Sequence, residues 1–126
     1  MELAHIALWT TNLDIAAAFW RDHFNATVGD LYLSRRREGF SSRFVTLPGN
    51  ICIELMTAPW IGPDAPIDRR GWAHIALSLG SVGAVDAAAA RFAKVGLLIS
   101  PPRWTGDGYY EAIIKSPDDL PIEIVQ

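Results

Sequence analysis

Hydrophobic and polar positions follow the same pattern twice along this chain. An apolar run at residues 3–9 predicts a strand, and Thr11 or Asn12 then provides the N-cap of a helix that ends near Phe24. The remaining apolar and alternating stretches of this half predict three further strands, at residues 28–36, 40–47 and 50–56. The Pro48-Gly49 pair between the last two is typical of a hairpin turn. The first half is therefore predicted to fold as βαβββ.

The second half gives the same order of elements. Its predicted elements are a strand at residues 72–79, an alanine-rich helix at 82–95 ended by Gly96, and strands at 97–100, 109–115 and 121–125. The turn Ser116-Pro117-Asp118-Asp119 separates the last two strands.

The two halves also share sequence. The pentapeptide AHIAL occurs at residues 4–8 and again at 73–77, an offset of 69 residues. The same offset relates Ile53-Glu54 to Ile122-Glu123, which makes coincidence a poor explanation. We expect two modules, residues 1–58 and 70–126, joined by a proline- and glycine-rich linker at 59–69. Together they predict one α+β domain with internal pseudo-two-fold symmetry, whose mixed sheet would surround a cleft if it is curved.

Composition narrows the class of protein. The chain has 126 residues, of which 50% are hydrophobic and 20% charged, as expected for one globular domain. A formal net charge of −3 disfavours a nucleic-acid partner. No apolar stretch is long enough to span a membrane, and the N-terminus lacks the features of a signal peptide. The single cysteine, Cys52, excludes an internal disulfide. We expect a soluble cytoplasmic protein.

Four polar residues interrupt the apolar strands at related positions: His5, Glu54, His74 and Glu123. Side chains alternate between the two faces of a strand, so each of the four lies opposite the Ile/Leu face that a helix would cover. Taken singly, each is more often a hydrogen-bonded core histidine or an edge carboxylate.

Taken together, the four residues favour a metal site. A carboxylate placed mid-strand among apolar residues is costly unless it is paired or bound to a metal. Here the repeat supplies two carboxylates and two imidazoles in symmetric positions. Two nitrogen and two oxygen ligands, completed by water, suit Ni, Co, Mn, Fe or Zn.

Three further residues are candidates for substrate contact. A two-residue turn at Pro48-Gly49 would place Arg43 on the face of Glu54, although a register slip of one residue would reverse this placement. Tyr110 is expected to lie similarly near Glu123. Trp9 follows the first strand on the face of His5 and is expected to line the cleft.

The chain resembles the vicinal oxygen chelate superfamily, also called the glyoxalase/bleomycin resistance/dioxygenase group. The residues that carry the resemblance are AHIAL at 4–8, Asp14 with FWRD at 19–22, IELM at 53–56, WAHIAL at 72–77, TGDGYYE at 105–111 and SPDDLPIE at 116–123. The last segment departs from the family's usual Asp-Pro-Asp-Gly turn at Ser116 and Asp119.

The resemblance implies paired βαβββ modules around a metal and, in many members, a homodimer. The His, Glu, His, Glu set is most similar to that of metal-dependent glyoxalase I. This implies a lyase or isomerase whose substrate binds through two vicinal oxygens, with Glu123 as the base and Glu54 able to take the reverse role by symmetry. A thiol such as glutathione is an implied cofactor, although the sequence shows no recognisable set of residues that would anchor it.

Two alternatives stay open at this stage. His5, His74 and Glu123 also form the facial triad expected of an extradiol-type dioxygenase with iron. A protein that sequesters a small molecule such as an antibiotic, without turnover, would use the same cleft. One scaffold hosts many reactions, so the fold alone does not decide between these.

Overall fold

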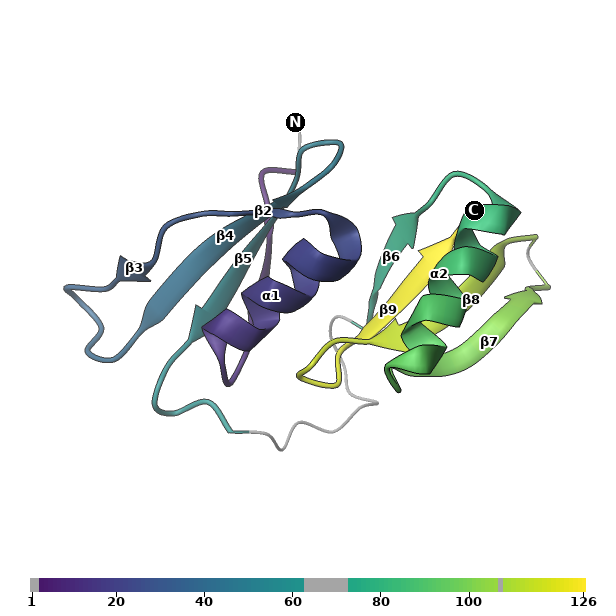
Figure 1. The fold of residues 1–126 in the computed structure, drawn as a ribbon. Coiled ribbons are helices and arrows are strands. Elements are labelled where there is room, and N and C mark those ends of the chain that lie inside the picture. The colour runs from purple at the N-terminus through teal and green to yellow at the C-terminus, as the bar shows by residue number, and fades with distance from the viewer. Residues whose placement is uncertain (1–2, 63–72, 107) are drawn as a thin grey trace. The chain divides into compact units, whose positions relative to one another are not determined.

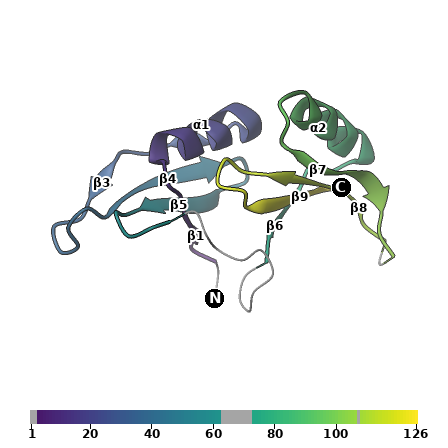
Figure 2. The same cartoon turned by 90° about the horizontal axis from the view of Figure 1, so that it is seen from below.

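The computed structural model describes residues 3–62, 73–106 and 108–126 and divides the chain into two compact units, Met1–Ala65 and Pro66–Gln126. In each unit, one helix covers one face of one sheet (Figures 1 and 2). This arrangement is the mixed α+β fold, built as two modules, that the repeat predicts. The predicted linker and the start of the strand at Trp72 lie largely outside the described residues, so the module boundaries stay a prediction.

The first unit orders its strands β1-β5-β4-β2, with the short β3 also pairing β4. β1 runs parallel to β5, and the other pairings are antiparallel. Its elements are β1 (Ile6–Trp9), α1 (Leu13–Phe24), β2 (Thr27–Val28), β3 (Tyr32–Leu33), β4 (Ser41–Leu47) and β5 (Ile51–Thr57). The single strand predicted at 28–36 is thus two short strands, β2 and β3.

The second unit repeats the pattern with the order β6-β9-β8-β7. β6 runs parallel to β9, and the other two pairings are antiparallel. Its elements are β6 (Ile75–Ser78), α2 (Val82–Lys94), β7 (Leu98–Trp104), β8 (Tyr110–Lys115) and β9 (Pro121–Val125). β7 continues past the predicted end at residue 100, through two prolines.

Local chemistry fixes both helices. The side chain of Asn12 accepts hydrogen bonds from the backbone N–H groups of Asp14 and Ile15, at 3.1 and 3.0 Å, which caps α1 as predicted. Asn25, at φ 54°, ends α1 in the left-handed conformation. Ser81 caps α2 by accepting from the backbone N–H of Ala84.

The core of each unit lies between its helix and the Ile/Leu face of its sheet. In the first unit the apolar face of α1, including the fully buried Trp20, packs on β4 and β5. In the second unit α2 packs on β7, β8 and β9 around the fully buried Phe92. The buried sheet residues are Val45, Leu47, Ile53 and Leu55 in the first unit, and Ala112, Ile114, Ile122 and Ile124 in the second. We call the opposite face of each sheet its open face.

The helices of the described chain are short. Neither α1 nor α2 is long and apolar enough to cross a membrane.

Candidate functional site

The first His–Glu pair lies on the open face of the first unit. His5 immediately precedes β1, and Glu54 lies in the middle of β5, where it is the partner of Ala7 in the parallel pairing. The His5 Nε2 atom is 3.7 Å from Glu54 Oε2. The imidazole is 42% exposed and the carboxylate 19% exposed, so both remain accessible to a bound ion.

The second pair has the same arrangement. His74 precedes β6, and Glu123 in β9 is the partner of Ala76. The His74 Nε2 atom is 3.3 Å from Glu123 Oε2, and the two side chains are about as exposed as those of the first pair. The sequence repeat is therefore also a repeat of side-chain geometry.

The spacing in each pair fits two ligands of one metal ion. Nitrogen and oxygen ligands at about 2.1 Å from an ion are about 3.0 Å apart at an octahedral centre and about 3.4 Å apart at a tetrahedral one. The observed 3.3 and 3.7 Å lie near these values. Among the residues that the structure describes, no third His, Cys, Asp or Glu joins either pair to form a larger metal-binding group. Each unit thus offers one such pair of candidate ligands, and metal binding by a four-ligand set stays a prediction.

One aromatic side chain contacts the first pair, and a second lies farther along the same open face. Phe44 lies directly opposite Glu54 across β4 and β5, and its ring meets the His5 imidazole edge-on with centroids 5.5 Å apart. Trp9, paired with Met56, lies on the same open face, is 39% exposed and contacts Phe40. Trp9 therefore shares the open face with His5, with Ala7 between them, and its contact with substrate stays a prediction.

The predicted position of Arg43 is wrong. Leu47 pairs with Ile51, so three residues rather than two connect β4 to β5. The register shifts by one, Arg43 lies opposite Leu55, and its side chain points to the helix side of the sheet. Phe44 takes the place beside Glu54 that was expected for Arg43.

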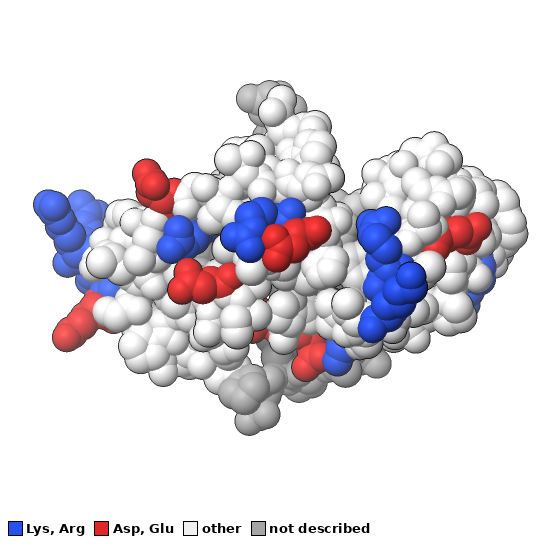
Figure 3. Space-filling model, viewed as in Figure 1, with Lys and Arg blue, Asp and Glu red and all other residues white. Residues whose placement is uncertain are grey.

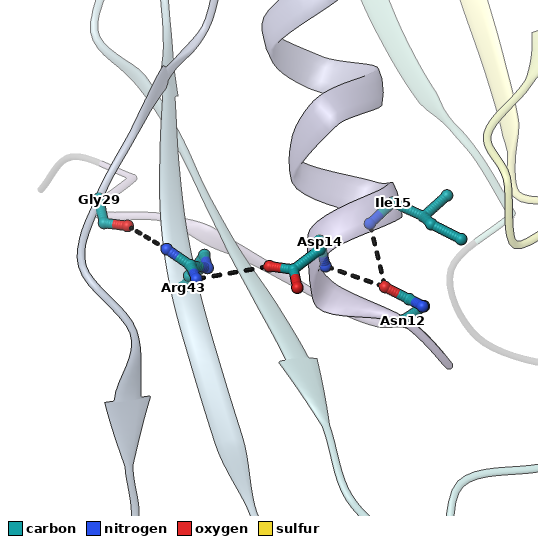
Figure 4. Close-up of polar contacts among 5 residues, drawn as sticks. All are labelled: Asn12, Asp14, Ile15, Gly29 and Arg43. Carbon is teal, nitrogen blue, oxygen red and sulfur yellow. Dashed lines mark hydrogen bonds and ion pairs between the residues drawn. The ribbon is translucent and has the colours of Figure 1, made fainter.

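Arg43 instead joins the start of α1 to its sheet (Figure 4). Its Nη1 donates to the carbonyl of Gly29 at 3.2 Å, and its Nη2 lies 3.4 Å from Asp14 Oδ1. Its Nε is buried and has no hydrogen-bond partner among the described residues. The side chain is 25% exposed, whereas that of Asp14 is 87% exposed, so the ion pair is largely in water.

Replacing Arg43 tests this structural role. We expect Arg43→Ala to lower the free energy of unfolding by about 1–2 kcal/mol, because it removes a mostly buried side-chain stem. Arg43→Met keeps the stem and removes the unpaired Nε, so its effect should stay below about 1 kcal/mol. Urea denaturation measures both variants. A larger loss for Arg43→Met than for Arg43→Ala would contradict this explanation.

The predicted position of Tyr110 is also wrong. Ile113 is the residue opposite Glu123, while Tyr110 alternates with Ala112 and Ile114 toward α2. Its hydroxyl donates a 2.7 Å hydrogen bond to Asp86 Oδ1 on that helix. This hydrogen bond is the main cause of a raised pKa for Tyr110.

Titration of Tyr110 tests its hydrogen bond to Asp86. In Asp86→Asn we expect the pKa of Tyr110 to fall back toward the ordinary value of 10.0, because the acceptor charge that holds the phenolic proton is removed. The measurement is phenolate absorbance against pH in a chain that carries Tyr32→Phe and Tyr109→Phe. An unchanged titration would show that Tyr110 does not bond to Asp86 in solution.

Two features of the open faces were not predicted. Phe44 was missed because its placement depends on the length of the turn. The other is an ion pair on the open face of the second unit, in which Arg103 Nη2 lies 3.2 Å from Glu111 Oε1. The alternation of β8 places Glu111 on the same face as Ile113, which was a usable signal for the carboxylate.

Charge is interspersed on the face drawn in Figure 3, where acidic and basic groups lie close to one another. Blue atoms gather at the left end, where Figure 1 places the connection between β3 and β4. That connection contains Arg35, Arg36 and Arg37, and the Arg37 guanidinium stacks over the rings of Phe40 and Trp60. Part of this basic run is thus held by aromatic contacts.

The family model for the Glyoxalase/Bleomycin resistance protein/Dioxygenase superfamily matches residues 2–124. The chain therefore belongs to this superfamily, as the sequence resemblance predicts. No curated protein matched the sequence.

Solved structures share the fold at low sequence identity. A glyoxylase/bleomycin resistance protein/dioxygenase domain from Frankia sp. EAN1pec superposes with a TM-score of 0.86 at 21% identity, over 99% of this chain and 96% of that one. A mutant of glyoxalase I from Zea mays gives 0.78 at 18% identity, over 98% of this chain but 43% of the maize chain. A mutant of the fosfomycin resistance protein FosX from Listeria monocytogenes, complexed with Mn(II) and 1S,2S-dihydroxypropylphosphonic acid, gives 0.70 at 21% identity, over 98% and 90%.

Proposed function

We propose that this protein is a metal-dependent lyase or isomerase of the glyoxalase type, which moves a proton on a small substrate bound through two vicinal oxygens. The observation that carries the proposal is the pair of matching His–Glu contacts, at 3.7 and 3.3 Å, on the open faces of the two units. Membership of the superfamily, which includes glyoxalase I and FosX among the neighbours of known structure, supports an enzyme of this general class.

In this proposal all four residues bind one divalent ion, contributed by one chain or by two copies of it. His5 and His74 are fixed ligands, because imidazole has no further role in proton transfer once it binds a metal. The bound ion would supply Lewis-acid stabilisation of the negative charge that develops on the vicinal oxygens. Glu123 takes the proton from the carbon next to the carbonyl, and Glu54 takes the reverse role by symmetry.

One neighbouring structure supports a divalent metal as the proposed cofactor. FosX was crystallised with Mn(II), and the nitrogen and oxygen ligands of this chain suit Ni, Co, Zn, Mn or Fe. A thiol such as glutathione is proposed as co-substrate, a homodimer as the assembly and the cytoplasm as the location.

The direct test is turnover of the hemithioacetal formed by methylglyoxal and glutathione. Metal-free protein is supplied in turn with each of the five metals. We expect thioester formation only in the presence of metal, followed by ultraviolet absorbance. Oxygen uptake with iron and a catechol would instead identify a dioxygenase. Tight binding of substrate without turnover or metal dependence would identify a sequestering protein.

A further inference from the structure

The open face of the second unit carries three cross-strand rows of side chains. Glu123 lies in the middle row, between Ala76 and Ile113. One flanking row contains Ser78, Val125, Glu111 and Arg103, and the other contains Pro121 and Lys115. Each flanking row thus ends in a cation.

The pairing of the edge strand β7 with β8 is irregular, and this irregularity places Arg103 in the row of Glu111. The pairing with β8 shifts by one residue between Leu98 and Ser100 and again between Ser100 and Arg103. Pro101 and Pro102 fall in the second interval, where neither has an N–H to donate to the ladder. Such irregularities re-aim side chains, and here they bring Arg103 opposite Glu111 while Trp104 faces the helix side with Tyr110.

Glu111 forms an ion pair with Arg103 on the open face. Its side chain is only 10% exposed, which is costly for a carboxylate without a partner. Within the described part of the chain, Arg103 is its only hydrogen-bond or ion-pair partner, through a single contact at 3.2 Å. The Arg103 side chain is 61% exposed, so the guanidinium remains accessible to a ligand while one of its nitrogens contacts Glu111.

The second cation of this face, Lys115, is held differently. Its Nζ lies 2.7 Å from Asp119 in the neighbouring turn, and the Asp119 side chain is 74% exposed. That pair is largely in water and its lysine is flexible. Arg103 has the more buried partner and the planar fork that matches an oxyanion, which makes it the better candidate for an anion ligand.

The spacing also suits a substrate bound at Glu123. With strands about 4.8 Å apart and residues two apart separated by about 6.7 Å, the Cα of Arg103 lies about 12 Å from that of Glu123. An extended arginine side chain covers about half of this distance. The remaining distance between the guanidinium and Glu123 could be spanned by a substrate a few bonded atoms long.

We propose that Arg103 binds an anionic oxyacid group of the substrate, a carboxylate, phosphonate or phosphate, and that Glu111 is the positioning residue for its guanidinium. The inference rests on the proposed function, because it places this group a few bonds from the vicinal oxygens held near Glu123. It adds an anionic group to the vicinal-oxygen substrate of the proposed function.

The test compares two chelators on the metal-loaded protein by calorimetry. Acetohydroxamate binds metals through vicinal oxygens and has a neutral tail, whereas succinic acid monohydroxamate adds a carboxylate. We expect the charged chelator to bind the wild-type protein about tenfold more tightly, a preference that Arg103→Ala abolishes. Acetohydroxamate should bind both proteins equally. Because Arg103→Ala leaves Glu111 buried and unpaired, the double variant Arg103→Ala/Glu111→Gln is measured beside it.

Two further variants serve as matched controls for the lost charge. Arg91→Ala removes a cation from α2, and Lys115→Ala removes the other cation of the same open face. Both should keep the tenfold preference. A preference that survives Arg103→Ala and its double variant, or that only Lys115→Ala removes, overturns the inference.

A separate experiment tests the anion site if the proposed function itself is wrong. If the wild-type protein takes up no metal or does not bind acetohydroxamate, methylphosphonate is titrated into the metal-free protein while the Arg103 Nε–H resonance is followed. A saturable shift that is lost in the Arg103→Ala/Glu111→Gln variant supports the anion site by itself. The absence of any such shift overturns it.

Discussion

Replacing His5 and His74 together with alanine is expected to leave a folded protein that retains no divalent metal. The wild-type chain, loaded and then dialysed, should hold about one ion per four-ligand set. The double variant keeps only Glu54 and Glu123, and the loss of both imidazoles should weaken binding by more than about 100-fold, since even residues behind the ligands contribute 10–100-fold. Elemental analysis of the purified proteins measures the difference.

The matched control is His23→Ala. His23 lies on α1, which covers the sheet face opposite His5 and Glu54, and its ring contacts Phe19 with centroids 5.2 Å apart. This variant should hold as much metal as the wild type. Metal that survives in the His5/His74 double variant would place the site elsewhere. Wild-type protein that stays metal-free after reconstitution would make the four residues a cleft lining and favour a binding protein.

Both His–Glu pairs could be predicted from the sequence because they depend on simple periodicities. Alternation along a strand separates Glu54 from the buried Ile53 and Leu55, and the structure places all three as expected. The offset of 69 residues then transfers the same arrangement to His74 and Glu123. Neither inference needs the exact length of a turn.

The predicted position of Arg43 did need the exact length of a turn, and it was wrong for that reason. Gly49 and Asn50 both adopt left-handed conformations, at φ 83° and 62°, so the turn includes Asn50 as well as the Pro48-Gly49 pair. Asparagine tolerates this conformation nearly as well as glycine, and the sequence does not say which residues a turn will use. Because side chains alternate with period two, one extra residue moves Arg43 from the open face to the helix side.

The Arg103–Glu111 pair could not be predicted from the sequence for a related reason. Two consecutive prolines in a short apolar stretch argue against a regular strand, so the predicted strand ended at residue 100. As an edge strand, β7 accommodates both prolines through irregular pairing with β8, its only partner among the described strands. The outcome depends on where the irregularities fall, which is a property of the whole sheet.

Replacing Glu123 with glutamine is expected to separate catalysis from metal binding. Glutamine has the size of glutamate and keeps one oxygen that can bind a metal, but it cannot accept the substrate proton. General base catalysis contributes about 10²- to 10⁴-fold, so kcat should fall by about 1,000-fold while most of the metal remains. Turnover of the hemithioacetal and elemental analysis are measured on the same preparation.

Glu54→Gln is the internal comparison, because Glu54 has the same contact with a histidine in the other unit. If Glu123 is the base for a given substrate, Glu54→Gln should retain more turnover than Glu123→Gln at equal metal content. The reverse order would exchange the two roles, as the symmetry of the modules allows. Full turnover in Glu123→Gln would show that the base assignment is wrong, because an amide in that position has no means of removing the proton.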